Sequence, residues 1–272
     1  MAVLAVHDLS CYSKSSLTVV LPVLEALGVE TAVLPTALLS TQTDGFDGIF
    51  VQDEHEAMRK ILDHFKRLKL RFDGVYSGFL GSAEEIETVK YAASAFSSFL
   101  LVDPVMGDNG ELYQTVSDEL CSEMITLVKH ADIITPNFTE AMILTGLDDG
   151  FKKQGPRAIK DQITVLRSLG PERGVITGIP LEAGGLGNAA WDGDEIRLFQ
   201  YDDLGVSYPG SGDLFASLLF ALVVKGGSFF GSVGHATSIS TNAVLDAKMK
   251  GREGRLGIAL SPVMDEIRRR ML

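Results

Sequence analysis

The segment Pro209-Gly210-Ser211-Gly212-Asp213 places two glycines around a serine, directly before an aspartate and an apolar run. Glycines permit a tight turn at a helix start, where unpaired backbone N–H groups attract an anion. A carboxylate in such a turn would repel a phosphate, so Asp213 is better suited to accept a proton from an attacking hydroxyl group. The pattern predicts phosphoryl transfer, with an ordinary helix start as the alternative for an isolated turn of this kind.

A second group of oxygen-bearing side chains follows two predicted strands. Asp103 and Asp108 come after one strand, and Asn137 and Glu140 come after the next. Carboxylate and amide oxygens suit a hard cation such as Mg²⁺, held partly through water and substrate phosphates. The structural alternative is that Asn137 caps a helix beginning near Phe138, with Glu140 at its third position. Both interpretations remain open from these residues alone.

The elements that must position these groups alternate between β-rich runs and helical patterns. This alternation predicts an α/β fold with a mainly parallel central sheet and helices on both faces. The predicted strands are Ala2–Val6, Thr31–Leu34, Gly74–Ser77, Phe99–Val102, Ile133–Thr135 and Val175–Thr177. The predicted helices are Ser15–Leu27, with a kink or late start at Pro22, and Glu54–Leu68, Glu84–Phe96, Asp118–Val128, Thr139–Leu144 and Ile159–Leu169. Ligands in such sheets collect beyond the carboxyl ends of the strands.

The pattern changes after Thr177. Two runs, Ala189–Trp191 and Ile196–Tyr201, are joined by a Gly-containing turn and predict a hairpin. Beyond Asp213 the chain is mostly helical, and Lys225-Gly226-Gly227 divides two helices. Because we find no internal repeat or low-complexity linker, we expect one domain over residues 1–272.

Composition excludes several classes of function. The chain has 272 residues and a formal net charge of −12, which disfavours a nucleic-acid or anionic-membrane partner. Its two cysteines, Cys11 and Cys121, form no metal-ligand spacing, and we expect both to be reduced. We find no secretory signal pattern at the N-terminus and no apolar run long enough for a membrane span. We therefore expect a soluble cytoplasmic protein.

Other polar and aromatic residues near the strand ends have a structural and a functional interpretation. We expect His7 to be a hydrogen-bonded structural residue and Cys11 to be inert. Tyr12 and Phe79 are core residues or, alternatively, an aromatic clamp. The residues expected in a polar loop after the second strand are Thr36, Ser40, Gln42 and Thr43.

Five segments, in order and spacing, give the chain its resemblance to the pyridoxal kinase branch of the ribokinase-like superfamily, from Val3 to about Ala247. They are Pro35-Thr36-Ala37-Leu38-Leu39-Ser40, Gly78-Phe79-Leu80-Gly81, Val102-Asp103-Pro104-Val105-Met106-Gly107-Asp108, Ile134-Thr135-Pro136-Asn137-Phe138-Thr139-Glu140 and Gly210-Ser211-Gly212-Asp213. The resemblance implies ATP-dependent phosphorylation of the 5′-hydroxymethyl group of a vitamin B6 compound. It also implies a homodimer.

The resemblance assigns roles residue by residue. Asp213 matches the catalytic base, and Gly210, Ser211 and Gly212 match the anion hole around the transferred phosphoryl group. The positions matching the nucleotide side are Asp108, Asn137, Glu140 and Thr177. The positions matching a cation site, for Mg²⁺ with K⁺ as a further candidate, are Asp103, Thr135 and Glu140. The positions expected around the substrate are Asp8, Ser10, Thr43 and Phe79, together with Asp213.

Some residues depart from the family pattern. Ser211 stands where Thr is usual, which retains the hydroxyl group. Asp8 and Phe79 stand where Ser and Tyr are common, and Ser13 stands where Gly is expected. An acidic Asp8 predicts a preference for a substrate with more hydrogen-bond donors, such as pyridoxamine.

Alternative functions share parts of this pattern. A hydroxymethylpyrimidine kinase would share Asp213 and its turn, but the segment from His7 to Tyr12 lacks the Gly-rich signature of that branch. The chain is short for a ribokinase-type sugar kinase. The presence of Asp213 disfavours a non-catalytic nucleotide- or vitamer-binding protein. A dinucleotide-dependent dehydrogenase would need a GxGxxG turn after the first strand, which is missing. We expect the contacts to the nucleotide base to come from residues near 234–243.

Overall fold

The computed structural model describes residues 1–97, 99–147 and 151–271. Within these residues the main sheet has nine strands, in the order β11-β10-β9-β8-β5-β4-β1-β2-β3. The strands are β1 (Ala2–Ser10), β2 (Glu30–Leu39), β3 (Val51–Asp53), β4 (Gly74–Ser77), β5 (Leu100–Val102), β8 (Ile133–Ile134), β9 (Arg173–Pro180), β10 (Leu186–Asp192) and β11 (Glu195–Tyr201). A separate hairpin pairs β6 (Gly107–Asp108) with β7 (Glu111–Leu112).

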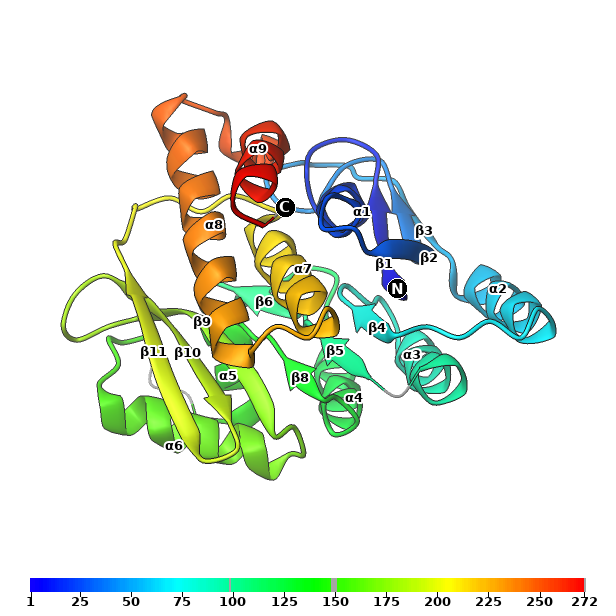
Figure 1. Ribbon diagram of the computed structural model, residues 1–272, viewed down its shortest axis with the longest axis horizontal. Coiled ribbons are helices and arrows are strands. Elements are labelled where there is room, and N and C mark those ends of the chain that lie inside the picture. Colours follow the sequence, from blue (N-terminus) through cyan, green and yellow to red (C-terminus); the bar gives the residue numbers. More distant parts are fainter. Residues whose placement is uncertain (98, 148–150, 272) are drawn as a thin grey trace.

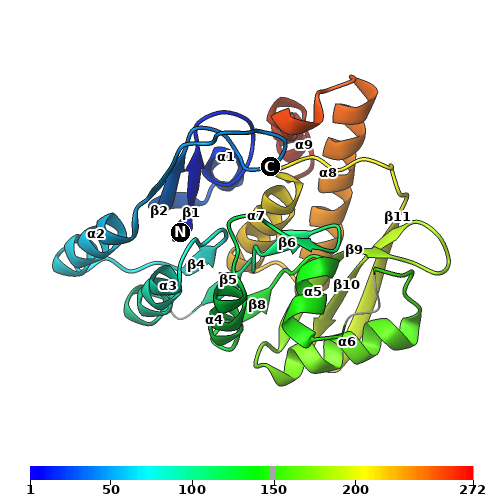
Figure 2. The ribbon, with the colours of Figure 1, turned by 180° about the vertical axis from the view of Figure 1, so that it is seen from behind.

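Helices cover both faces of this sheet, as Figures 1 and 2 show from opposite sides. The helices are α1 (Leu17–Ala26), α2 (His55–Arg67), α3 (Ala83–Phe96), α4 (Asp118–Val128), α5 (Phe138–Thr145), α6 (Pro156–Ser168), α7 (Ser211–Val224), α8 (Phe229–Met249) and α9 (Leu260–Met271), with a 3₁₀ turn at Gly254–Leu256. The predicted three-layer α/β/α arrangement is confirmed.

The six strands from β2 to β9 that form the middle of the sheet are parallel to one another. The antiparallel strands β10 and β11 extend one edge, and β3 pairs antiparallel with β2 at the other. The carboxyl ends of the parallel strands therefore lie along one side of the sheet. The loops that follow them carry Phe79, Asp103 and Thr135, three of the candidate site residues.

Two apolar cores hold the layers together, one on each face of the sheet. Side chains of α2 to α6 pack on one face around fully buried residues such as Leu4 and Trp191. Side chains of α1, α7, α8 and α9 pack on the other face, around residues such as Ala5 and Phe220. Leu4 and Ala5 are neighbours on β1 but lie in different cores, because successive strand side chains point to opposite faces. The central strands are buried on both sides.

Most predicted elements are present, and the largest errors are at their ends. The strand predicted over Thr31–Leu34 extends to Leu39, so Thr36 lies within β2 and not in the loop after it. The helix α1 runs through Pro22 and begins at Leu17, so Pro22 does not mark its start. Strand β3 is not predicted by the sequence pattern, because its three residues are all exposed and give no apolar signal.

The hairpin of β6 and β7 was also missed. Its turn contains Asn109 and Gly110, which have φ values of 53° and 85°. An Asn-Gly pair is a strong signal for such turns, so this hairpin could have been found from the sequence.

Among the described residues, no helix is both long enough and apolar enough to cross a membrane. Cys11 is exposed and Cys121 is buried, and both are free thiols as expected.

Candidate active site

The turn before α7 forms a helix N-terminus with free donors. Gly210 is the residue preceding the helix and has a φ of 83°, a conformation that suits glycine. The N–H of Ser211 donates to the carbonyl of Tyr208 at 3.2 Å, and the N–H of Leu214 donates to that of Gly210 at 2.9 Å. Among the described residues, the N–H groups of Gly212 and Asp213 have no backbone acceptor outside the helix, as expected for a first helical turn. These two groups can bind an anion.

Asp213 lies in this first turn, and its carboxylate is fixed from another part of the chain. Its Oδ2 accepts a hydrogen bond of 2.8 Å from the backbone N–H of Ser16. Burial raises the pKa of Asp213 to about 6, and the charge of Asp8 adds to this increase. A carboxylate with this pKa is ionised near neutral pH yet is a better proton acceptor than an ordinary aspartate.

Asp8 lies near the carboxyl end of β1 and is 4% exposed. Its Oδ2 accepts a hydrogen bond of 2.9 Å from the Ser10 hydroxyl, and its Oδ1 accepts one from the Ser16 hydroxyl. Burial raises the pKa of Asp8, while these two hydroxyl groups counteract the increase. Ser16 therefore contacts both Asp8 and Asp213.

Two carboxyl groups and a hydroxyl group are buried where β5 and β8 end. Asp103 and Glu140 are 7% and 3% exposed. Burial raises the pKa of both carboxyls; the Asp213 charge adds to this for Asp103, and the Asp103 charge adds to it for Glu140. The Thr135 hydroxyl is also buried there, beside Asp103. A cation would compensate the two carboxylates, so these residues fit a bound Mg²⁺.

Glu140 also caps α5, which is the structural alternative predicted for it from the sequence. Its Oε2 accepts the Asn137 N–H at 2.8 Å, while its own N–H donates to Asn137 Oδ1 at 2.9 Å, completing a capping box. Its Oε1 accepts the N–H of Met106 at 3.1 Å. Asn137 Nδ2 donates to the Gly107 carbonyl at 2.7 Å. Both residues thus join the segment after β5 to α5.

The carboxylates are not arranged as a set of direct metal ligands. Within the described ranges, no group of three or more His, Cys, Asp or Glu side chains could jointly hold a metal ion. A cation at Asp103 and Glu140 would need further oxygen ligands from water and substrate phosphates, as Mg²⁺ commonly has.

Two further residues expected at the nucleotide lie on β6 and β9. Asp108 accepts hydrogen bonds at 2.8 and 3.1 Å from the backbone and side-chain amides of Asn109, and burial raises its pKa. Thr177 is half-buried on β9, and its N–H donates to the carbonyl of Pro136 at 2.9 Å. Tyr113 was not singled out in the sequence. Burial raises the pKa of Tyr113, and the charges of Glu140, Asp108, Asp103 and Asp213 contribute to this increase.

The residues expected at the substrate are spread over several loops. Phe79 is half-buried, and its carbonyl accepts a 3.0 Å hydrogen bond from the Thr36 hydroxyl. Thr43 is exposed in the loop after β2, and no hydrogen bond of its side chain is found in the described structure. Tyr12 is 55% exposed and packs edge-on against Phe46 at 6.0 Å, so it is not a core residue.

His7 is buried as expected, but it is not hydrogen-bonded. Both ring nitrogens lack partners among the described residues, and burial lowers its pKa to about 3. Its ring packs edge-on against Tyr76 at 4.3 Å, and a Cβ at Gly78 would lie 2.2 Å from His7 Nδ1. The neutral ring therefore fills space beneath the loop that carries Phe79.

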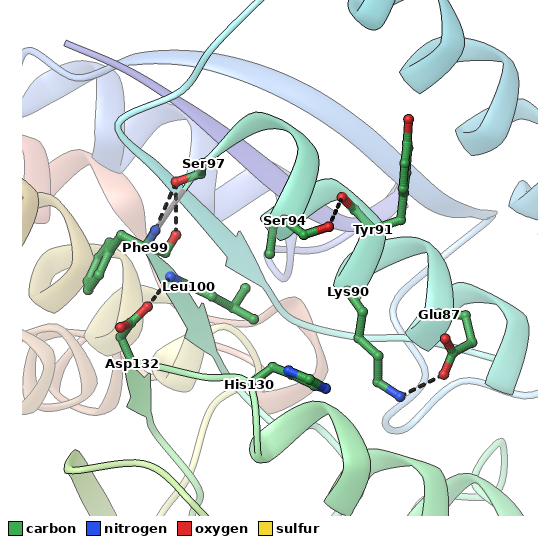
Figure 3. A pocket seen from close by; sticks show the side chains of 10 residues that line it. Glu87, Lys90, Tyr91, Ser94, Ser97, Phe99, Leu100, His130 and Asp132 are labelled. Atoms are coloured by element: carbon green, nitrogen blue, oxygen red, sulfur yellow. Dashed lines mark hydrogen bonds and ion pairs between the residues drawn. The ribbon is translucent and has the colours of Figure 1, made fainter.

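Two cavities lie outside this cluster. One, of about 350 Å³, is lined by Phe199, Tyr201, Gly234, Thr237 and Thr241, among others, where the nucleotide base was expected. The other, of about 470 Å³, lies between α3 and the segment around His130 and Asp132 (Figure 3). It is at the amino ends of β5 and β8, on the opposite edge of the sheet from Asp213. It does not belong to the candidate active site.

The fold is that of the ribokinase-like kinases. Residues 21–256 match the family model described as phosphomethylpyrimidine kinase, and the chain belongs to this family. A pyridoxal kinase of Actinobacillus pleuropneumoniae is 30% identical, over 82% of this chain and 80% of the relative. The relationship to pyridoxal kinases expected from the five motifs is confirmed.

Solved structures are similar over almost the whole chain. A Bacteroides thetaiotaomicron protein described as a phosphomethylpyrimidine kinase, in a crystal form with pyridoxal, is 31% identical with a TM-score of 0.89 over 98% of this chain and 95% of that one. The pyridoxal kinase of Lactobacillus plantarum is 30% identical with a TM-score of 0.89, over 98% and 96%.

Some curated relatives are much longer. The chain spans 46% of a Schizosaccharomyces pombe protein described as a pyridoxal kinase, at 27% identity over 55% of this chain. It spans 42% of a thiamine biosynthetic bifunctional enzyme of Arabidopsis thaliana, at 28% identity over 82% of this chain.

Proposed function

We propose that this protein transfers the γ-phosphoryl group of ATP to the 5′-hydroxymethyl group of a vitamin B6 vitamer, pyridoxal, pyridoxamine or pyridoxine. The observation that carries the proposal is the position of Asp213 in a helix N-terminus with free N–H groups. The Bacteroides relative crystallised with pyridoxal supports the substrate class. The vitamer 5′-phosphate is the product.

Asp213 acts as the general base in this proposal. Its Oδ2 is held by the Ser16 N–H, which leaves Oδ1 for the substrate hydroxyl. As the hydroxyl oxygen attacks the γ-phosphorus, its proton moves to the carboxylate and the bond to the β-phosphate oxygen breaks. The N–H groups of Gly212 and Asp213 donate to the phosphoryl oxygens where charge develops.

The neighbouring residues hold the nucleotide. Asp103, Thr135 and Glu140 would hold Mg²⁺, in part through water, and Asp108, Asn137 and Thr177 would lie beside the phosphates. When bound, Mg²⁺ neutralises charge on the phosphate oxygens. The requirement for K⁺ is a separate expectation, which measurement with and without this ion would test. The cavity lined by Gly234 and Thr237 is placed to take the adenine base.

We also propose that residues 1–272 act as one kinase domain, that the protein is a homodimer and that it is cytoplasmic. The continuous sheet from β1 to β11 supports the first point. The two free cysteines agree with a reducing compartment.

A second candidate is a hydroxymethylpyrimidine kinase, favoured by the description of the matching family model and by the thiamine biosynthetic relative. It would use the same Asp213 and a different acceptor ring. The segment from His7 to Tyr12 favours the first candidate, because it lacks the Gly-rich signature expected of that branch.

A coupled ADP-release assay tests the proposal. The acceptors are pyridoxal, pyridoxamine, pyridoxine and hydroxymethylpyrimidine, each with ATP and Mg²⁺. We expect turnover with at least one B6 vitamer at a kcat/KM higher than that for hydroxymethylpyrimidine. Turnover only with hydroxymethylpyrimidine would favour the second candidate, and nucleotide binding without turnover would support a non-catalytic binding protein.

A further inference from the structure

A β-bulge interrupts the pairing of β9 with β10 beside the cavity expected to hold the nucleotide base. The register shifts so that two residues of β9, Thr177 and Gly178, lie opposite one residue of β10, Asn188. Gly178 has a φ of 70°, a conformation that suits glycine. Bulges commonly re-aim side chains next to functional sites. At this bulge the Asn188 side chain contacts β9, β11 and α8.

The amide of Asn188 is buried, and its hydrogen bonds fix its orientation. It is 4% exposed. Its Oδ1 accepts the N–H of Gly178 at 3.1 Å and the hydroxyl of Tyr201 at 3.3 Å, and its Nδ2 donates to Thr237 Oγ1 at 2.9 Å. Because a backbone N–H can only donate, the amide oxygen must face Gly178. The amide nitrogen therefore faces Thr237.

This orientation leaves the proton of the Thr237 hydroxyl free. The Thr237 oxygen accepts from Asn188, so its own O–H must find an acceptor elsewhere. On the same helix, the Ser232 hydroxyl donates to the carbonyl four residues earlier, but no such bond of Thr237 is found in the described part of the chain. Thr237 is 7% exposed and lines the cavity of about 350 Å³. A ligand in that cavity can accept this proton.

Tyr201 offers the opposite group from the other wall of the cavity. Burial raises the pKa of Tyr201 to about 12, while the N–H of Gly178 counteracts the increase, so the phenol is neutral. Its hydroxyl donates to Asn188, and its oxygen can accept a hydrogen bond from a ligand. The helix α8 packs against β10 and β11, so the donor and the acceptor lie on facing elements (Figure 1). Adenine carries ring nitrogens that accept and an exocyclic amine that donates.

The same bulge connects the cavity with the expected phosphate side of the site. The N–H of Thr177 donates to the carbonyl of Pro136 at 2.9 Å, and Thr177 forms a parallel bridge with Asn137. Asn137 is the cap of α5. Asn188 therefore lies between the cavity and the segment proposed to lie beside the phosphates.

We propose that Thr237 binds the adenine base through its hydroxyl proton, and that Asn188 is the positioning residue that fixes this hydroxyl as a donor. The inference rests on the proposed function, which places an adenine nucleotide in this cavity. A hydroxyl whose direction is set before binding loses less freedom when the ligand arrives. Asn188 itself touches no ligand and acts through Thr237.

The first test compares Thr237→Val with Thr237→Ser. Valine keeps the branched shape and removes the hydroxyl, whereas serine keeps the hydroxyl. Thr164→Val is the matched control, because Thr164 is an exposed threonine on α6. The measured quantities are the dissociation constants of adenosine and of ADP, together with KM for ATP and kcat with a B6 vitamer. Adenosine reports on the base without the phosphates.

We expect Thr237→Val to raise the dissociation constants of adenosine and ADP by the same factor, about 3- to 10-fold, the range for one lost neutral hydrogen bond. KM for ATP should rise in parallel while kcat stays within about twofold. All values should stay within about twofold in Thr237→Ser and Thr164→Val. Unchanged adenosine binding in Thr237→Val, or an equal loss in Thr237→Ser, would overturn the donor role of Thr237.

The second test examines Asn188 through the pH dependence of adenosine binding. In Asn188→Asp the side chain can still accept from Gly178, so the bulge keeps its hydrogen bond. An ionised carboxylate cannot donate to Thr237 and instead accepts its proton, whereas a protonated carboxyl group can donate as the amide did. Adenosine is neutral, so the added charge does not repel it as it would a phosphate.

We expect the dissociation constant of adenosine in Asn188→Asp, relative to wild type, to be raised about 3- to 10-fold near pH 9 and to fall as the pH is lowered towards about 5. The double variant Asn188→Asp/Thr237→Val should bind adenosine no more weakly than Thr237→Val, because both changes remove the same donor. A ratio to wild type of one at every pH, or additive losses in the double variant, would overturn the role of Asn188.

The outcomes separate this inference from the proposed function. Turnover of a vitamer with ATP, combined with unchanged adenosine binding in Thr237→Val, would overturn the inference alone. Binding of adenosine and ADP with the expected responses, but no transfer to any acceptor, would overturn the proposed function and leave the roles of Thr237 and Asn188 in place.

Discussion

The backbone N–H of Ser16 donates a 2.8 Å hydrogen bond to Oδ2 of Asp213, although the two residues are 197 positions apart. The hydroxyl of the same serine donates to Asp8. Ser16 adopts a φ of 46°, which is uncommon for a residue other than glycine. A strained residue that contacts both acids is consistent with a site that holds them in a defined geometry.

Asp213→Asn should lose most of its turnover, because the amide cannot accept the substrate proton. We expect kcat to fall by about 10²- to 10⁴-fold, the usual contribution of a general base. The dissociation constant of the nucleotide should change little. Asp63→Asn, an exposed position on α2, is the control and should retain wild-type kcat. Near wild-type turnover in Asp213→Asn would contradict its assignment as the base.

The activity of the wild-type enzyme should depend on pH through Asp213. With a pKa of about 6, the carboxylate is ionised above that pH and protonated below it. We expect kcat/KM to be level above pH 7 and to fall by about tenfold per unit below pH 6. A profile of kcat/KM from pH 4.5 to 8.5 measures this, and a rate that is constant down to pH 5 would rule it out.

The same raised pKa predicts a trend in stability. Between pH 3.8 and about 6, the folded state retains a proton on Asp213 that the unfolded state has released. The stabilisation that comes from this retained proton is therefore complete below pH 3.8 and is lost as the pH rises through about 6. The melting temperature of Asp213→Asn, relative to wild type, should increase over that interval. A constant difference in melting temperature would contradict the shift.

Gly210→Ala should destabilise the protein. A Cβ at this position would lie 2.5 Å from the carbonyl oxygen of Lys14, and the φ of 83° disfavours alanine. We expect a loss of about 1–3 kcal/mol in the free energy of unfolding, measured with urea. At Gly212, a Cβ meets no atom within 4 Å, so Gly212→Ala should not destabilise. Equal stability of the two variants would contradict this account of the turn.

Glu140→Gln tests the proposed cation site while the cap of α5 is kept. The glutamine oxygen can complete the capping box, but its amide nitrogen cannot accept the N–H of Met106, so the melting temperature should fall. The lost carboxylate should raise the Mg²⁺ concentration for half-maximal activity by about tenfold or more. The measurement is a Mg²⁺ titration of turnover, with chelation of the metal expected to abolish activity. An unchanged Mg²⁺ dependence would remove Glu140 from the cation site.

Asp8→Ser should weaken the preference for pyridoxamine over pyridoxal, because it removes a buried acid from the expected substrate position. It should also lower the pKa of Asp213, which the charge of Asp8 raises. Values of kcat/KM for both vitamers, and the pH at which activity falls, test the two effects. An unchanged ratio for the vitamers, with unchanged kcat/KM for pyridoxal, would exclude a role for Asp8 in substrate choice.

Local sequence was sufficient to predict the alternation of strands and helices and the turn before Asp213. Apolar periodicity and glycine positions are set by neighbours in the chain, so β4 and α4 have the predicted bounds. The capping role of Asn137 and Glu140 was also visible, because it depends on a spacing of three residues. The sequence could not decide between a helix cap and a cation site for these two residues, since both roles use the same side chains.

The residue types and their order along the chain determined the α/β class, the kinase family and Asp213 as the candidate base. The tertiary structure alone decided what surrounds that base. Ser16 contacts both Asp213 and Asp8 only because folding brings the segment before α1 to the first turn of α7. Burial, which sets the pKa values of these acids, is likewise a property of packing across the sheet and is not contained in any local pattern.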